Sequence, residues 1–258
     1  MDRLVFITGA SSGIGQALAW RYHQAGWRLA LAARRTDAME QWASERGLGA
    51  DRCAVYAADV ADRDSIIAAG RACLGGQGLP DAVIANAGIS IGVDTAVRED
   101  IDVVARTFAT NTVGLAATFH PFVAGMERRG SGVLVGIASV AGIRGLPGHG
   151  AYCASKAAAI AYCESLRGEL RSRGVKVVTI CPGYVDTPLT RRNSYAMPFL
   201  MTPEAFAARA FRVIEAGTSY CVIPWQMGVV AKLLRLLPNP LFDRALSGRP
   251  RKTRQTGR

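Results

Sequence analysis

Tyr152 and Lys156 are the residues whose types and spacing most directly suggest chemistry. They lie four residues apart in YCASK, so a helix would carry both side chains on one face, one turn apart. A phenol normally titrates near pH ~10, and a lysine ammonium beside it would lower that pKa. A lone pair with this spacing is more often an accident of the surface, but Ser139 ends an apolar run thirteen residues before Tyr152. The three residues together predict proton transfer on a substrate oxygen.

A glycine-rich stretch near the start of the chain suggests a phosphate site. TGASSGIG, Thr8–Gly15, joins an apolar run to an amphipathic segment. Glycines allow a sharp turn and a close approach of phosphate to the backbone, and the start of the following helix favours an anion. The spacing G-x-x-x-G-x-G differs from the usual G-x-G-x-x-G, and a plain tight turn is the alternative. We expect the loop to hold the pyrophosphate of a dinucleotide.

The end of the second apolar run indicates which dinucleotide. An acidic residue there would bind the ribose hydroxyls of NAD and repel a 2′-phosphate. This run ends LALAARRTD, with Ala33 in place of the acid and Arg34 and Arg35 after it. Guanidinium groups bind phosphate through charge-assisted hydrogen bonds, and Ser11 or Ser12 is a further donor. The pattern favours NADP(H), the alternative being two arginines at the start of a solvated loop.

Short apolar runs alternate with helix-compatible segments along most of the chain. Such strands, each followed by a helix, indicate an α/β fold: a Rossmann-like, doubly wound, parallel seven-stranded sheet with helices on both faces. The helix-compatible segments include 14–25, 64–74 and 151–173. The expected strands are 3–7, 28–33, 54–57, 82–85, 132–138, 176–181 and 219–224.

Composition and charge limit the function classes. The chain of 258 residues carries a net charge of +11, but the residues from Trp225 onward contribute eight basic side chains against one acid. The basicity belongs to this end and lacks a nucleic-acid-binding module, so we expect no nucleic acid partner. Six cysteines show no metal-ligand spacing, so we expect no metal site and mostly buried thiols. With no signal peptide or spanning segment in the sequence, a cytoplasmic location is the expectation.

Several motifs, in order, resemble those of the short-chain dehydrogenase/reductase family. TGASSGIG resembles the cofactor loop of that family, and Tyr152 with Lys156 resembles its Y-x-x-x-K pair. The other matching positions are Asp59–Val60, Asn86–Ala87–Gly88, Asn111, Ser139, and Pro182–Gly183 followed by Val185 and Thr187. The resemblance covers roughly Leu4–Pro188 and is loose beyond that point.

The resemblance implies an oxidoreductase that transfers hydride between NADP(H) and a ketone or secondary alcohol, without a metal. Tyr152 would act as general acid/base, Ser139 would hold the substrate oxygen, and Lys156 would also bind the nicotinamide ribose. Asn111 would hold a water in a proton relay to Lys156. The residues assigned to the cofactor are Gly9, Ser11, Ser12, Gly13, Ile14, Gly15, Arg34, Arg35, Asp59, Val60, Asn86, Ala87, Gly88, Tyr152, Lys156, Pro182, Gly183, Val185 and Thr187.

The sequence contains no Pro/Ser-rich linker, internal repeat or low-complexity block, so we expect a single catalytic domain over residues 1–224. The same resemblance implies a homodimer or homotetramer. The alternative is a regulatory or scaffold protein that binds a dinucleotide and does little catalysis. The presence of Asn111, Ser139, Tyr152 and Lys156 argues against that alternative.

Residues 188–202 are expected to form a lid over the substrate. Its apolar lining would be Met197, Phe199, Leu200 and Met201, which suits a hydrophobic or lipid-like carbonyl compound. Arg191 and Arg192 are expected to be exposed charges, with an acidic substrate group as the alternative. His149 is expected to line the mouth of the pocket or to be solvated.

Residues 225–258 are expected to form an amphipathic helix and a basic tail. Val229, Val230, Leu233, Leu234 and Leu237 would share one side of the helix, with Lys232 and Arg235 towards the other and Pro238 ending it. Packing on the body or on a second subunit is the first expectation, and peripheral contact with an anionic membrane is the second. RPRKTRQTGR, at 249–258, is expected to lack fixed structure.

Overall fold

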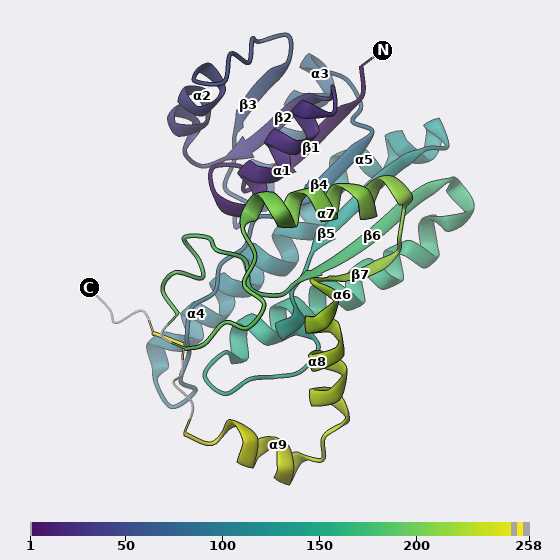
Figure 1. The fold of residues 1–258 in the computed structure, drawn as a ribbon. Helices are drawn as coiled ribbons and strands as arrows, with labels where there is room; N and C mark the ends of the chain where they lie inside the picture. Colours follow the sequence, from purple (N-terminus) through teal and green to yellow (C-terminus); the bar gives the residue numbers. More distant parts are fainter. Residues whose placement is uncertain (1, 194, 249–251, 255–258) are drawn as a thin grey trace.

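A parallel β-sheet forms the centre of the molecule (Figure 1). The computed structural model describes residues 2–193, 195–248 and 252–254. Within these residues seven strands pair in the order β3-β2-β1-β4-β5-β6-β7, which confirms the predicted fold class. The strands are β1 (Leu4–Thr8), β2 (Arg28–Ala33), β3 (Cys53–Ala57), β4 (Ala82–Ala85), β5 (Gly132–Ile137), β6 (Val175–Pro182) and β7 (Tyr220–Ile223).

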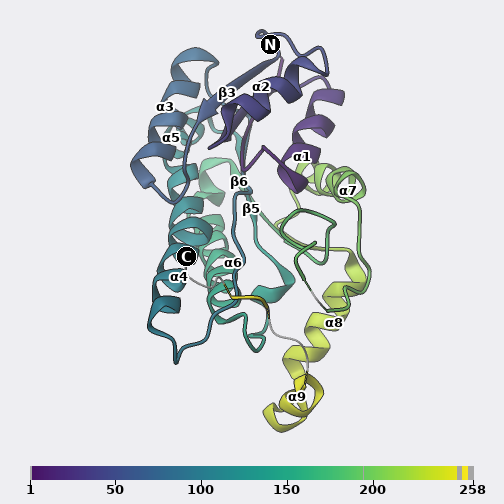
Figure 2. The same ribbon diagram turned by 90° about the vertical axis from the view of Figure 1, so that its left-hand side faces the viewer.

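Helices cover both faces of the sheet (Figures 1 and 2). One face carries α1 (Gly13–Gln24), α2 (Thr36–Ser44) and α7 (Pro203–Ala216). The other carries α3 (Arg63–Gly76), α4 (Arg98–Phe108), α5 (Gly114–Arg129) and α6 (Gly150–Leu170), with a turn of π-helix at Ala109–Val113 between α4 and α5.

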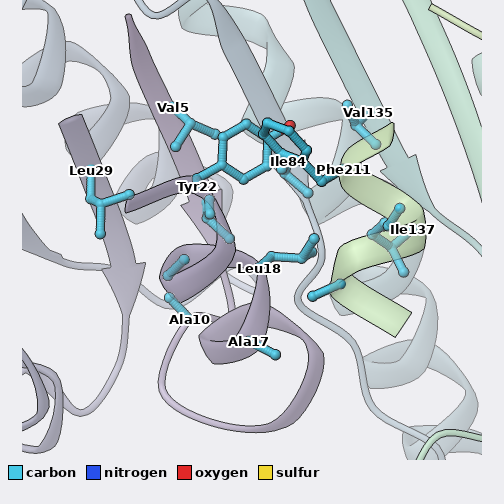
Figure 3. Close-up of a cluster of buried hydrophobic side chains, with 14 of the residues drawn as sticks. Val5, Ala10, Ala17, Leu18, Tyr22, Leu29, Ile84, Val135, Ile137 and Phe211 are labelled. Atoms are coloured by element: carbon cyan, nitrogen blue, oxygen red, sulfur yellow. The ribbon is translucent and has the colours of Figure 1, made fainter. Parts of the chain in front are cut away.

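The apolar strands are buried because each face of the sheet has its own core. Beneath α1 and α7, the ring of Tyr22 meets Phe211 edge-on at 4.9 Å between centroids, and Leu18 lies one turn earlier on α1 (Figure 3). On the opposite face, Phe6 packs against Phe122 of α5 at 5.0 Å between centroids. Burial of one such side chain stabilises the fold by about 1.5–3 kcal/mol. These two layers fix the sheet and therefore the loops at its edge.

The chain order places the candidate site at one edge of the sheet. From β1 the chain winds outward through β2 to β3, and after β4 it winds the other way through β5, β6 and β7. The carboxyl ends of β1 and β4 are therefore neighbours at a switch point, where loops leave a crevice. Thr8, Asn86 and Ser139 all lie at or just after carboxyl ends of these central strands.

Beyond β7, two helices form an arm that extends from the sheet (Figures 1 and 2). They are α8 (Trp225–Leu236) and α9 (Asn239–Leu246). α8 ends before Pro238 as predicted, whereas α9 was not predicted. The predicted grouping of α8 side chains was wrong: Val229 and Leu233 are exposed, while the other three expected members, Val230, Leu234 and Leu237, are partly buried. Among the described residues, no helix is long and apolar enough to span a membrane.

The expectation of an unstructured tail was wrong for Lys252, Thr253 and Arg254. The carbonyl oxygen of Thr253 accepts a hydrogen bond from the backbone N–H of Gly92 at 3.0 Å, and Arg254 pairs with Asp100. These contacts bridge long sequence distances, so composition alone gave no sign of them. The rest of that expected tail, 249–251 and 255–258, lies outside the described residues.

Candidate active site

A cleft of about 530 Å³ runs along the carboxyl edge of the sheet. Its walls come from the glycine loop, the residues after β2 and β4, the start of α6 and the segment after β6. All the predicted site residues line it except Gly15 and Asn111, which lie directly behind the lining. The sequence-predicted residues on its walls are Gly9, Ser11, Ser12, Gly13, Ile14, Arg34, Arg35, Asp59, Val60, Asn86, Ala87, Gly88, Ser139, Tyr152, Lys156, Pro182, Gly183, Val185 and Thr187.

The glycine loop has the geometry of an anion cradle. Gly9 has φ +64°, and a Cβ there would lie 2.8 Å from the Cα of Ala87, so a side chain is excluded. A Cβ on Gly15 would overlap the carbonyl oxygen of Gly9, so only glycine lets α1 start this close to β1. Ser12 precedes α1 without a side-chain capping bond, and no acidic residue lies in the first turn. The first-turn N–H groups therefore suit a phosphate.

Asn86 holds this loop in place. Its side-chain amide donates to the carbonyl oxygens of Thr8 and Gly9 at 3.0 and 3.3 Å. Its backbone N–H donates to Oγ1 of Thr8 at 3.1 Å. The residue was expected to touch a cofactor, and its side chain also ties the end of β4 to the loop.

Arg34 and Arg35 form the cationic end of the cleft. Both side chains are exposed, and a guanidinium nitrogen of Arg34 lies 4.0 Å from a carboxylate oxygen of Asp59. An exposed pair at this distance contributes little stability. Because the pairing is so weak, the positive charge remains available at the cleft wall.

Ser139, Tyr152 and Lys156 meet at the other end. Ser139 follows β5, accepts a backbone bond from Ala141 at 3.1 Å, and is also hydrogen-bonded to the phenol of Tyr152. The ammonium of Lys156 donates to the carbonyl oxygen of Ile137 at 2.7 Å. α6 brings Tyr152 and Lys156 to the same wall, as their spacing predicted.

The direction of the pKa shift of Tyr152 differs from the expectation. Burial raises the pKa of the Tyr152 phenol, and the hydrogen bond with Ser139 opposes this shift in part. Burial lowers the pKa of Lys156 from 10.5 to about 8. The expected lowering of the phenol pKa by Lys156 is therefore not what the structure gives, because desolvation is the larger effect on both groups.

Asn111 lies in the π-helical turn and is almost fully buried. Its side-chain oxygen accepts from the N–H of Ile89 at 2.8 Å, while its amide donates to the carbonyl oxygen of Ile89 at 2.9 Å and to Oγ of Ser155 at 2.9 Å. The amide thus braces the loop after β4. A Cβ on Gly88 would lie 3.2 Å from Oδ1 of Asn111 and 3.4 Å from Nζ of Lys156, so these two polar atoms face the same small glycine.

The expected lining of the lid was wrong. Phe199 and Leu200 are exposed, and Met201 is buried in a β-bridge with Val185. None of Met197, Phe199, Leu200 and Met201 lines the cleft; Pro188, Leu189 and Thr190 do so instead. Arg191 is exposed, as expected, and pairs with Asp186 at 2.8 Å.

His149 is buried, which corrects the expectation of a pocket-mouth or solvated side chain. Its Nδ1 lies 3.0 Å from the carbonyl oxygen of Pro147 and its Nε2 lies 3.2 Å from the hydroxyl of Tyr195. Burial lowers its pKa, so the neutral imidazole donates from Nδ1 and accepts at Nε2. His149 thus holds the start of α6 and one point of the lid.

Sequence reasoning missed part of the cleft wall. Ile89 and Ile91 lie just after the N-A-G motif, and their position there was the available signal. Arg106 and Thr110 line the cleft from α4 and the π-helical turn. Their spacing of four residues on helical backbone was a signal for a shared face.

Comparison with known proteins supports what this geometry suggests. The family model described as short chain dehydrogenase matches residues 3–197. The chain belongs to the short-chain dehydrogenase/reductase family. Members of this family are oxidoreductases that bind nicotinamide dinucleotides and act on small molecules, and most are oligomers.

Three relatives illustrate the range of this dehydrogenase family. An uncharacterized oxidoreductase of Myxococcus xanthus is 38% identical to the chain, with 94% of this chain and 96% of the relative covered. The 2-(R)-hydroxypropyl-CoM dehydrogenase of Xanthobacter autotrophicus is 32% identical, with 74% and 78% covered. The crystal structure of a short-chain dehydrogenase from Streptomyces avermitilis superposes with a TM-score of 0.79 at 24% identity, with 90% and 91% covered. The similarity to the Streptomyces avermitilis structure shows the fold alone.

Proposed function

We propose that this chain is an NADP(H)-dependent oxidoreductase that interconverts a ketone and a secondary alcohol. The observation that carries the proposal is one cleft with Ser139, Tyr152 and Lys156 at one end and Arg34 and Arg35 at the other. The relative named 2-(R)-hydroxypropyl-CoM dehydrogenase acts, by its name, on a secondary alcohol. The apolar Ile89, Ile91 and Leu189 favour a hydrophobic or lipid-like substrate.

The cofactor residues fit NADP(H) better than NAD(H). The glycine loop suits the pyrophosphate, because its first-turn N–H groups have no side-chain cap. Ala33 ends β2 where an acid would bind the ribose hydroxyls, so this position carries no charge that would repel a 2′-phosphate. Arg34 and Arg35 supply cations at that point. When bound, the nicotinamide supplies or accepts the hydride.

The side chains at the catalytic end handle the proton. In reduction, Ser139 donates a hydrogen bond to the substrate carbonyl oxygen and orients it beside the phenol of Tyr152. The Tyr152 hydroxyl then gives its proton to that oxygen as negative charge develops, and the reverse occurs in oxidation. The raised pKa of Tyr152 keeps the phenol protonated at neutral pH, which suits its role as an acid. Lys156 holds a charge behind it, and Asn111 keeps the adjoining loop rigid.

Tyr152→Phe tests this proposal. The substitution removes only the hydroxyl, so NADPH oxidation with a panel of hydrophobic ketones should fall about 10²–10⁴-fold. NADPH binding, followed by fluorescence, should stay within about twofold. Tyr162→Phe, on the exposed side of the same helix, is the matched control and should retain full activity. If native protein binds NADPH tightly but reduces none of the ketones, the result would favour the regulatory or scaffold alternative.

An exposed apolar stripe on the arm favours a contact with a membrane surface, in addition to the proposed reaction. Trp225, Val229, Leu233 and Leu236 recur every three or four residues, so they form one stripe on α8. Together with Leu241 of α9 their exposed fractions run from 48% to 79%. Met227 and Ala231, on the opposite side, are buried against the body. An apolar stripe this exposed marks an interaction site.

The charges beside this stripe favour an anionic membrane over a second subunit as its partner. Lys232, Arg235 and Arg244 are exposed beside it, with Asp243 as the single acid in 225–248. A two-fold contact between copies through this face would bring like charges together. Anionic lipid headgroups complement them, while the apolar stripe enters the interface. We therefore propose peripheral membrane contact by the arm of an otherwise cytoplasmic homodimer or homotetramer.

Vesicle sedimentation tests the membrane contact. Native protein should pellet with phosphatidylserine-containing vesicles and release at high salt, and Leu233→Ser/Leu236→Ser should abolish pelleting. Ile101→Ser removes a comparably exposed apolar side chain on α4 and should pellet as the native protein does. Equal pelleting of native protein and double variant would contradict the proposal. A lower oligomeric state in the double variant alone would instead assign the stripe to a second subunit.

A further inference from the structure

Three described residues near the end of the chain lie beside the cleft. Lys252, Thr253 and Arg254, here named the strap, lie against the loop after β4 and against the lid. The parallel β-bridge between Gly92 and Arg254 fixes the register of the strap. A Cβ on Gly92 would overlap the carbonyl oxygen of Lys252, so the close approach requires glycine at that position.

Arg254 anchors the strap to α4. Its Nε donates to Oδ2 of Asp100 at 2.7 Å and a terminal nitrogen donates to Oδ1 at 3.3 Å, a two-point contact. The Asp100 side chain is only 3% exposed and also accepts from the N–H of Asp94 at 2.6 Å. A buried carboxylate with two partners of this kind is strongly held, and losing one partner leaves it uncompensated.

Lys252 anchors the same strap to the lid. Its ammonium donates to the side-chain oxygen of Asn193 at 2.5 Å and lies 3.5 Å from the carbonyl oxygen of Leu189. The lysine side chain is buried although both of these partners are neutral. Leu189 itself lines the cleft, and so does Ile91, the residue before Gly92. The strap therefore joins two walls of the substrate end that are about a hundred residues apart in the chain.

We propose that the strap is a positioning element of the active site, which sets the distance between Leu189 on the lid and Ile91 on the loop after β4. Among the described residues, no contact joins the strap to the glycine loop or to Arg34 and Arg35, so its influence falls on the substrate and not on the dinucleotide. The expected change in KM rests on the proposed function. The expected change in hydrogen exchange rests on the contacts of the strap alone.

Two variants disturb the strap, one by removing it and the other by removing its anchor on α4. A chain ending at Gly248 lacks it entirely, and full-length Asp100→Asn/Arg254→Ala loses the ion pair without leaving a buried charge. Arg98→Ala is the matched control, because it removes an exposed Arg–Asp pair on the same helix, α4. Hydrogen exchange of residues 89–93 and 189–193, followed by mass spectrometry, reports on the two walls without any need for turnover.

The shortened chain should exchange about tenfold faster in both segments and the double variant in residues 89–93, with residues 9–15 unchanged in both. Their KM for a ketone should rise at least about fivefold, with the KM for NADPH within about twofold. Unchanged exchange in the shortened chain, or an equal rise in residues 9–15, would overturn the proposal, since the strap would then be dispensable or a general stabiliser. If native protein reduces no ketone, the proposed function fails, and the exchange comparison still decides the role of the strap.

Discussion

The two ends of the cleft are built in different ways. At the proposed dinucleotide end, the walls come from neighbouring elements of the sheet: the glycine loop after β1, whose backbone forms the cradle, the end of β2 and the residues after β4. At the proposed substrate end, the walls come from segments far apart in the chain, which the strap joins through Asn193 and Asp100. A backbone cradle tolerates almost no change in shape, whereas the substrate end can be altered one segment at a time.

The largest effect should come from filling the cradle. Gly15→Ala places a Cβ against the carbonyl oxygen of Gly9, so we expect a loss of about 2 kcal/mol in the free energy of unfolding. Gly168→Ala, on α6 with open space around its Cβ position, should instead gain about 0.5–1 kcal/mol. Urea unfolding of the two variants measures both values. Equal changes in the free energy of unfolding for Gly15→Ala and Gly168→Ala would show that the glycine loop tolerates a Cβ as well as an open helical position does.

The arginines should decide between the two dinucleotides. For Arg34→Ala/Arg35→Ala we expect the ratio of NADH to NADPH dissociation constants to fall about tenfold, or about 1.4 kcal/mol, because the phosphate contacts are lost. Fluorescence titration with each dinucleotide measures the ratio. Arg71→Ala, an exposed arginine on α3, is the control. An unchanged ratio would mean that the residues after β2 do not select NADP(H).

Lys156, at the end of the cleft with Ser139 and Tyr152, should make stability depend on pH. Its pKa in the folded protein is about 8, below its ordinary 10.5. Between these values the unfolded chain keeps a proton that the folded protein has lost, so stability rises with pH. Relative to Lys156→Met, native protein should gain about 1 kcal/mol between pH 8 and 9. Lys176→Met, at an exposed lysine, should gain as much stability between pH 8 and 9 as native protein does. If the difference in the free energy of unfolding between native protein and Lys156→Met did not change with pH, the prediction would be wrong.

The smallest effect on folding is expected at the arm. Leu236→Ser should change the free energy of unfolding by less than about 0.5 kcal/mol, because the side chain is already in water. Met227→Ser, on the buried side of the same helix, should destabilise clearly. Thermal unfolding of both variants makes the comparison. A large loss for Leu236→Ser would place the stripe against protein and weaken the proposal of a membrane contact.

The sheet and the dinucleotide end could be predicted from the sequence because their determinants are local. Apolar runs between helix-compatible segments fixed the strands to within two residues, and β2 and β4 match their predicted bounds. Parallel strands then place their carboxyl ends together, which brings Gly9, Asn86 and Ser139 to one cleft. Helical spacing alone put Tyr152 and Lys156 on one wall.

The substrate end could not be predicted because its contacts are long-range. Phe199 adopts φ +56° and is exposed outside the cleft lining, which no local pattern indicates. The Arg254–Asp100 pair spans 154 residues, and composition suggested only a solvated tail. Desolvation, which a motif does not contain, raises the pKa of Tyr152 and so reverses the direction expected from a neighbouring ammonium.

Arg144 ties the arm to the loop that follows Ser139. The chain fixes the base of the arm at β7, while the guanidinium of Arg144 binds the carbonyl oxygens of Leu234 and Leu237 and lies 3.8 Å from the ring centroid of Phe242. Arg144 lies five residues after Ser139 on a short loop. The arm is therefore held at two places, at its base by β7 and along its length by Arg144, which fixes its direction relative to the sheet.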